Sequence, residues 1–403
     1  MEKKGTVLGA TFLVAGTSIG GGMLAFPVAT GEAGFIPSVF LMLVGWAFMT
    51  LVALYLSEVN LWMKPGEHVI AMTSRFLGFW GKSVAWLLYL FICYASLVAY
   101  TSGTSELCGA FLRQFFPISD VWASVVFVLL ASFVVYLGNI VIGRVNTLLV
   151  VGLIVSYLLL VLTSLKSIDV HNWLRREWKG SFVAMPLLLS IFSFHTILPS
   201  LTIYLKQDGK MLRRSIIYGT LSALAIYLIW QAVVLGALHW NNGLETSLIE
   251  GKPATKFFGS GTGRPLLGLI ADAFAFFAMV TSFLGIGMGL FDFLADGLKI
   301  PKVRWGAVLL GVMIIVPTLF FALTVKRVFL RALDSTGGIG DSILNALFPA
   351  LMLWIGRYKM KLESEYRIPG GKSLIFIAMC YAICVFLLEI LGMLGVVKSL
   401  GGS

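Results

Sequence analysis

Four glycines crowd the first hydrophobic segment, in the stretch VAGTSIGGGMLAFP at residues 14–27. Each glycine costs a helix interior about 1 kcal/mol relative to alanine, which disfavours them in a plain membrane helix. They permit an unwound turn at bilayer depth, where bare N–H and C=O groups are tolerated when they face a ligand. A helix that restarts near Gly22 points its N-terminal amides at the break, which suits a carboxylate. The alternative is that Gly16, Gly20, Gly21 and Gly22 only let helices pack closely.

A second interruption is expected in the stretch SIFSFHTILPS at residues 190–200. Pro199 removes a backbone donor and clashes with the carbonyl of His195, so we expect the helix to unwind over residues 192–196. Carbonyls of both unwound segments would then face an ammonium group. Together the two breaks predict a binding site for a zwitterionic α-amino acid.

Three side chains at membrane depth are candidates for coupling to an ion. Thr281 and Ser282 are adjacent hydroxyls that, with carbonyls of a broken helix, would form an oxygen cage for sodium. Hydrogen bonds back to their own helix are the alternative. His195 lies in the second predicted break and titrates in the physiological range, so it is a candidate proton sensor or substrate contact. The alternative for His195 is a neutral ring that satisfies freed backbone groups.

Other acidic residues in hydrophobic segments lie mostly near segment ends. Asp292 and Asp296 are expected to pair with basic residues just beyond their segment. Glu58 and Glu106 are candidates for relaying protons, with structural contacts between helices as the alternative.

One motif points to a different class of function, an intramembrane enzyme. GIGD at residues 338–341 matches the glycine-x-glycine-aspartate string of membrane aspartyl proteases, which need a second aspartate to share a proton. Asp341 follows the loop-like run DSTGG, so we interpret it as the cap of a helix that begins near residue 339. The sequence contains no paired-histidine metal motif, GxSxG elbow or phosphate-binding loop, so neither an enzyme activity nor a cofactor is expected.

The elements that position these residues are membrane helices. Of the 403 residues, 59% are hydrophobic and only 12% charged, unlike a soluble domain. No alternating pattern of lipid-facing strands occurs, so the predicted fold class is an all-α polytopic membrane protein. Stretches long enough to cross a hydrocarbon core predict eleven helices. They cover residues 6–28, 35–62, 79–112, 121–138, 145–167, 181–205, 211–240, 264–297, 303–325, 339–357 and 373–397.

The first and sixth of these helices carry the predicted breaks. Transporters commonly contain two inverted repeats that each open with an interrupted helix. We therefore predict one transport domain over residues 1–403, with five-helix repeats at 6–167 and 181–357 and an extra helix at 373–397. The Gly-, Ser- and Lys-containing connection at residues 241–264 is compatible with an external lid, although a solvated connection is favoured.

The net charge of +11 comes from basic residues in short connections between helices. This distribution indicates a lipid bilayer rather than nucleic acid as the partner. Placing the N-terminus in the cytoplasm puts most of the 30 Lys and Arg residues inside, and the C-terminus then lies outside. The four cysteines lie within predicted helices and are interpreted as apolar filler, with neither a metal nor a disulfide.

The quoted stretches resemble those of the bacterial aromatic amino acid permease family, which includes tyrosine- and tryptophan-specific transporters. The resemblance extends over essentially the whole chain and includes TSFLGIGMGLFDFLAD at 281–296, SGTSEL at 102–107 and LSEV at 56–59. It implies the leucine-transporter fold and a bacterial inner membrane. It also implies import of an aromatic amino acid, for which we favour tyrosine, by proton symport and alternating access. The alternative is sodium coupling, or tryptophan or another neutral amino acid as substrate.

Carried over residue by residue, the resemblance assigns the substrate carboxylate to Ser18, Ile19, Gly20, Gly21 and Gly22. It assigns the amine to backbone carbonyls at Thr17, Phe192, Ser193 and Phe194, and a wall of the side-chain pocket to Tyr94, Leu97 and Thr101. A coupling sodium would take the carbonyls of Gly16 and Ile19 and the hydroxyls of Thr281 and Ser282. Where relatives tend to have glycine, this chain has Ser193 and Thr196, which changes the volume or polarity of the pocket.

Overall fold

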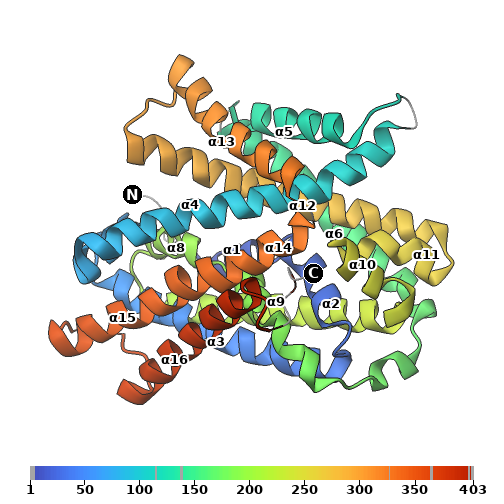
Figure 1. The fold of residues 1–403 in the computed structure, drawn as a ribbon. Coiled ribbons are helices and arrows are strands. Elements are labelled where there is room, and N and C mark those ends of the chain that lie inside the picture. The colour runs from blue at the N-terminus through green and yellow to red at the C-terminus, as the bar shows by residue number, and fades with distance from the viewer. Residues whose placement is uncertain are drawn as a thin grey trace.

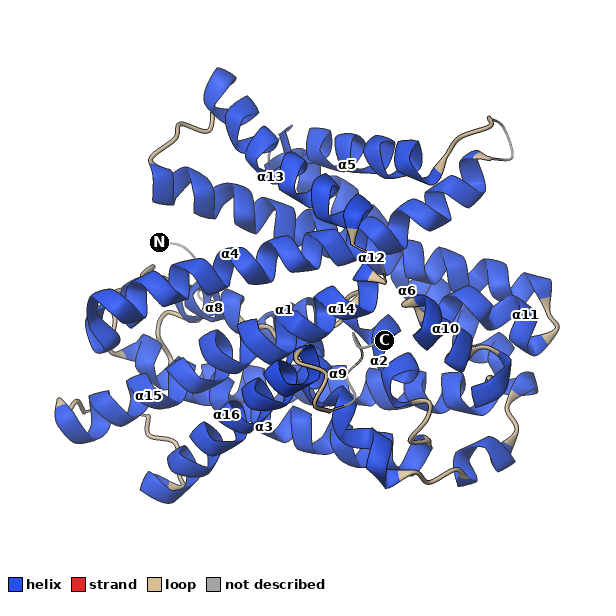
Figure 2. Ribbon diagram, in the orientation of Figure 1, coloured by secondary structure: helices blue, strands red, loops and turns tan. Residues whose placement is uncertain are grey.

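The structure is a computed structural model that describes residues 5–113, 116–136, 139–325, 327–363, 366–397 and 400. Helices dominate this part of the chain, and it contains no strand (Figure 2). The all-α prediction is therefore confirmed. Within these residues, nine helices are long and apolar enough to cross a membrane, and the bent first helix makes a tenth.

The helices of the first half of the chain are α1 (Val7–Ser18), α2 (Gly22–Thr30), α3 (Phe35–Leu61), α4 (Val69–Leu112), α5 (Asp120–Tyr136) and α6 (Asn139–Ser164). Those of the second half begin with α7 (Met185–Ile191), the single 3₁₀ turn η4 (His195–Ile197), α8 (Leu198–Tyr204) and α9 (Gly209–Ala237). Next come α10 (Leu244–Glu250), η6 (Ala254–Phe257), α11 (Phe258–Thr262), α12 (Pro265–Leu298) and α13 (Arg304–Thr324). One long helix is built from α14 (Val328–Ser335), η7 (Thr336–Leu347), α15 (Phe348–Trp354) and η8 (Ile355–Lys359), and α16 (Gly371–Met393) follows it.

Two groups of helices divide the molecule (Figure 1). In the upper layer of Figure 1, α4, α5, α12 and α13 pack against one another. Below them, α3 packs on α7, α8 and α9, while α1 packs on α9 and α2 on α7. The helix α6 contacts both groups, through α12 and α9. Among the largest fully buried side chains are Tyr227, Trp230, Phe192, Phe194 and Phe274, so part of the core lies around α9, the broken sixth helix and α12.

Most predicted spans lie within a few residues of a helix. The fourth predicted span corresponds to α5, which is an apolar helix of 17 residues and shorter than the spanning helices. The count of eleven spans and the inverted repeats therefore remain predictions. The third predicted span begins where α4 bends, because Gly78 adopts a φ of 71° inside that helix.

The interpretation of Asp341 as a helix cap is wrong. The long helix begins at Val328, so the run DSTGG is helical and Asp341 lies inside it, fully buried. The glycines of this run are needed for close packing rather than for a loop. A Cβ on Gly337 would overlap the carbonyl of Pro186, and one on Gly338 would lie 2.6 Å from the Glu389 side chain.

The connection at residues 241–264 is not the solvated chain that we favoured. It folds into α10, η6 and α11, and it packs against α2 and α12. Leu244, Ala254 and Phe258 are almost fully buried within it. Apolar side chains spaced through the connection form a small core. The Gly, Ser and Lys content of the connection gives no indication of this core.

Candidate functional site

The first helix is broken at the glycine cluster. Its halves α1 and α2 meet at an angle of 55°, and Ile19 between them is extended, with φ −80° and ψ 102°. A neighbouring helix approaches closely: the Ser282 hydroxyl accepts a hydrogen bond of 3.2 Å from the backbone N–H of Gly21. A Cβ on Gly20 would lie 2.7 Å from the Ser282 hydroxyl, and one on Gly21 would lie 2.5 Å from the Tyr100 ring. The glycines thus allow both the break in the helix and the close approach of Ser282 and Tyr100.

The sixth helix is broken where Pro199 predicts it. The helix α7 ends at Ile191, and α8 begins at Leu198 with Pro199 in its first turn, where the missing N–H costs nothing. Phe192 and Phe194 lie between the halves and are each 1% exposed. The predicted interruption is confirmed, but the unwound part is shorter than residues 192–196: residues 192–194 are non-helical, and His195 and Thr196 lie in the 3₁₀ turn η4.

Tyr227 on α9 joins the two breaks, and the sequence analysis missed it. Its hydroxyl contacts the carbonyls of Ser18 and Ile191, the second at 2.9 Å, and so shares one proton between the ends of α1 and α7. The next turn of α9 adds a hydrogen bond of 2.9 Å from the Trp230 indole to the carbonyl of Met23. A tyrosine in an apolar helix carries no motif, so only the three-dimensional arrangement reveals this role.

Replacing Tyr227 with phenylalanine is expected to lower the free energy of unfolding by about 1–3 kcal/mol, because two buried carbonyls lose their donor. Uptake should fall as well, since the two half-helix ends are no longer tied. The matched control is Tyr157→Phe on α6, whose hydroxyl donates to the Ile226 carbonyl at 3.0 Å, between helices and apart from both breaks. If both variants transport equally well, Tyr227 has only a structural role.

The remaining predicted residues are spread around the breaks. Ser18, Gly21 and Gly22 are buried, whereas Gly16 and Thr17 lie on an exposed face of α1. On α4, Leu97 and Thr101 are fully buried, with the Thr101 hydroxyl bonded to the Leu97 carbonyl, and the Tyr94 hydroxyl donates to the Met313 carbonyl. The structure therefore brings Ser282 to the first break but commits the Tyr94 hydroxyl to α13.

The candidate ion ligands differ in their contacts. The Thr281 hydroxyl donates back to carbonyls of its own helix, at 2.9 Å from Phe277 and 3.1 Å from Ala278. The Ser282 hydroxyl donates to the Ala278 carbonyl at 2.8 Å while it accepts from the first break. His195 is 1% exposed beside the Met49 backbone, and neither ring nitrogen makes a hydrogen bond to any described residue.

Ser193, in the second break, contacts the long helix that follows α13. Its hydroxyl donates to Asp341 at 2.7 Å, and Asn345 donates to the same aspartate oxygen at 2.6 Å. Asn345 also lies 3.1 Å from the Ser193 hydroxyl, which closes a triangle of three polar side chains. The sequence singles out Ser193 by its place in the predicted break, but no spacing in the sequence indicates this contact.

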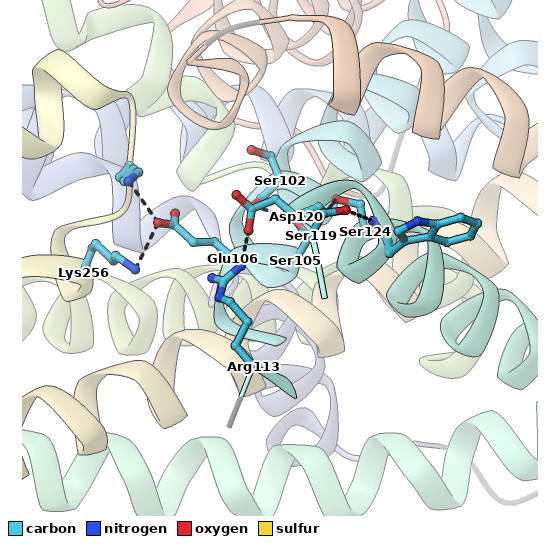
Figure 3. Close-up of polar contacts among 10 residues, drawn as sticks. Ser102, Ser105, Glu106, Arg113, Ser119, Asp120, Ser124 and Lys256 are labelled. Carbon is cyan, nitrogen blue, oxygen red and sulfur yellow. Dashed lines mark hydrogen bonds and ion pairs between the residues drawn. The ribbon is translucent and has the colours of Figure 1, made fainter. Parts of the chain in front are cut away.

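The packed connection after α9 is held to α4 by charge. Glu106 forms ion pairs with Lys252 at 2.9 Å and Lys256 at 3.0 Å, and Figure 3 shows Lys256 approaching its carboxylate. Burial alone would lower the pKa of Lys252, but the carboxylates of Glu250 and Glu106 outweigh it and raise this pKa. Such half-exposed pairs contribute at most about 1 kcal/mol each. Of the two hypotheses for Glu106, these contacts favour a structural role over proton relay.

Charge pairs also occupy the ends of two other helices. Lys302 pairs with Asp292 at 2.8 Å and with Asp296 at 3.3 Å, which confirms the pairing expected at the end of α12. Glu58 forms a buried ion pair with Arg357, again the structural alternative.

Known proteins of the same kind extend over the whole chain. A model of the tryptophan/tyrosine permease family matches residues 3–389. The chain is 29% identical over 423 residues to a tryptophan-specific transport protein of Haemophilus influenzae, covering 100% of this chain and 99% of that protein. It is 28% identical over 387 residues to tyrosine-specific transport system 1 of the same organism, covering 94% and 95%.

The fold has a solved counterpart. The crystal structure of MhsT in complex with L-phenylalanine matches with a TM-score of 0.64 and 15% sequence identity, covering 96% of this chain and 100% of that chain. MhsT has the leucine-transporter fold, so this chain shares that fold. The family match and the two broken helices both indicate a transport protein. The chain belongs to the tryptophan/tyrosine permease family and is an integral membrane transport protein, not an enzyme.

Proposed function

We propose that this protein imports an aromatic amino acid, most favourably tyrosine, by symport with protons across the bacterial inner membrane. The observation that carries the proposal is the junction of the two breaks, which Tyr227 ties together next to the start of α2. The N-terminus of α2 supplies amides and the positive end of a helix dipole for a carboxylate. Carbonyls at Thr17, Phe192, Ser193 and Phe194 supply the acceptors for the amine.

The substrate class rests on the relatives. Several relatives are named as tryptophan- or tyrosine-specific transporters and one as a glutamine transporter, and MhsT was solved with L-phenylalanine. Buried aromatic side chains at the second break, Phe192 and Phe194, offer apolar surface to an aromatic ring. Tryptophan or another neutral amino acid is the alternative substrate.

The coupling ion is the second part of the proposal. Both hydroxyls of the sodium alternative, Thr281 and Ser282, donate to carbonyls of their own helix. A hydroxyl that points its proton at a carbonyl still has lone pairs for a cation, so sodium stays the alternative. The carboxyl of Asp341 lies beside the second break and favours the proton as the coupling ion, because a carboxyl can bind and release one.

Access to the site differs on its two sides. All nine residues of α2 are buried, and α2 is packed against α7, α10 and η6. By contrast, α1 packs chiefly on α9 and exposes a face that includes Phe12, Leu13, Gly16 and Thr17 up to the break. With the N-terminus in the cytoplasm, the packed connection at residues 241–264 is external and closes the outer side. Alternating access then requires this segment and α2 to separate from the upper layer.

The test is uptake of labelled tyrosine, tryptophan and phenylalanine into proteoliposomes under an inward proton gradient without sodium. Accumulation of tyrosine that a protonophore abolishes supports the proposal. Accumulation that starts only when sodium is supplied favours the sodium alternative. Greater accumulation of tryptophan than of tyrosine would make tryptophan the preferred substrate. Absence of transport for all three amino acids under both gradients would overturn the proposed substrate class.

A further inference from the structure

Asp341 is a buried carboxyl at the second break that the predicted site does not include. It is 0% exposed and lies in η7, a π-helical stretch, which is a rare geometry that occurs frequently at functional sites. Both of its hydrogen bonds, from Ser193 and Asn345, fall on one carboxyl oxygen, Oδ1. The other oxygen, Oδ2, is buried and has no hydrogen-bond partner among the described residues.

This arrangement suits reversible protonation of the Asp341 carboxyl. The two donors to Oδ1 favour the carboxylate, whereas the dry surroundings of Oδ2 favour the neutral acid. No Lys, Arg or His in the described part of the chain forms an ion pair with Asp341, so no fixed positive charge holds it ionised. The neutral form would carry its proton on Oδ2, because both hydrogen bonds from protein donors fall on Oδ1.

Other titratable groups lie around Asp341. On α4, Cys93 and Tyr100 are near enough to interact with its charge, and neither carries a positive charge. Toward the start of the long helix, Asp334 is 3% exposed and lies near Glu389 of α16, whose carboxyl accepts a hydrogen bond of 2.8 Å from the Ser335 hydroxyl. Asp334 precedes Asp341 by seven residues. In the proposed orientation this second carboxyl pair lies on the outer side of Asp341, the side from which an imported proton enters.

We propose that Asp341 binds the coupling proton and controls the second break through Ser193. The inference rests on the proposed function and adds the residue that carries the proton. Binding forms one O–H bond on Oδ2 and breaks none in the protein; the proton comes from outer water and leaves to inner water. Hydrogen bonds to a carboxylate are about twice as strong as those to a neutral group. The carboxylate therefore holds Ser193 and the second break, and protonation weakens that hold.

The experiment compares two modes of transport in proteoliposomes, using labelled tyrosine, tryptophan and phenylalanine. Asp341→Asn, which mimics the neutral acid, should keep exchange of substrate for substrate but lose accumulation driven by a proton gradient. Its exchange rate should also no longer depend on pH. Asp341→Glu, which restores a carboxyl, should regain gradient-driven accumulation. The matched control is Asp292→Asn, which removes a carboxylate in a surface ion pair and should behave as wild type.

The outcomes separate this inference from the proposed function. Wild-type protein that neither exchanges nor accumulates any of the three amino acids overturns the proposed function and the inference with it. If wild type accumulates substrate under a proton gradient and Asp341→Asn does so with unchanged pH dependence, only the inference fails. Wild-type accumulation that needs sodium and ignores the proton gradient overturns the inference and the proton coupling of the proposed function, but it leaves import of an aromatic amino acid standing.

A second variant covers the case in which Asp341→Asn does not fold. Ser193→Ala removes only a hydroxyl and keeps the carboxyl, but it takes away one donor to the charged form. The carboxyl then keeps its proton to higher pH, so the midpoint of gradient-driven uptake at saturating substrate should move to higher pH. An unchanged midpoint would contradict the role of Asp341.

Discussion

Uptake of the aromatic substrate is expected to fall to background when Gly20 is replaced by leucine, while the protein still folds and inserts. A Cβ at this position would lie 2.7 Å from the Ser282 hydroxyl, so a leucine side chain forces the break away from α12. Overpacking of this kind costs about 1–3 kcal/mol. The same side chain fills the turn whose amides are proposed to bind the carboxylate.

The measurement is substrate binding by detergent-solubilised protein together with uptake into proteoliposomes. Gly311→Leu on α13 is the matched control, because a Cβ there meets no atom within 4 Å. That variant should fold, bind and transport as wild type. Transport by Gly20→Leu at the wild-type rate would mean that the first break is not part of the binding site.

The two breaks were predictable because their cause is local. Glycine and proline act on the backbone of their own segment, whatever the rest of the chain does. The cluster at Gly20, Gly21 and Gly22 and the proline at position 199 therefore mark the interruptions in the sequence itself. Even there, the close approach of Ser282 and Tyr100 to the glycines is visible only in the fold.

The same reasoning misled us at the run DSTGG, where glycines sit inside a helix. Close packing, which was the alternative weighed for the first segment, is the correct explanation at Gly337 and Gly338. Local composition cannot separate a glycine that unwinds a helix from one that lets another helix approach. The contact of Ser193 with Asp341 joins residues 148 positions apart, and the contacts of Tyr227 also depend on distant segments. No spacing in the sequence encodes them.

Replacing Arg357 with methionine is expected to lower the free energy of unfolding by about 3–5 kcal/mol, because it leaves a buried carboxylate without its counter-ion. The Arg357 and Glu58 side chains are 2% and 1% exposed, and two hydrogen bonds of 2.7 and 2.5 Å join them. The pair ties α3 to the end of the long helix. Unfolding by sodium dodecyl sulfate in mixed micelles measures the loss.

The double variant Glu58→Leu with Arg357→Met separates the cost of an unpaired charge from the contribution of the pair. Removing both charges leaves no buried ion, so the double variant should be more stable than Arg357→Met alone. It should not reach wild type, because the backbone N–H and C=O of Ile368 each bond to the pair at 2.9 Å and lose their partners. Each such loss costs about 1–3 kcal/mol. A double variant that is less stable than Arg357→Met would instead mean that Glu58 stabilises this junction even without its counter-ion, through its hydrogen bond from the Ile368 N–H.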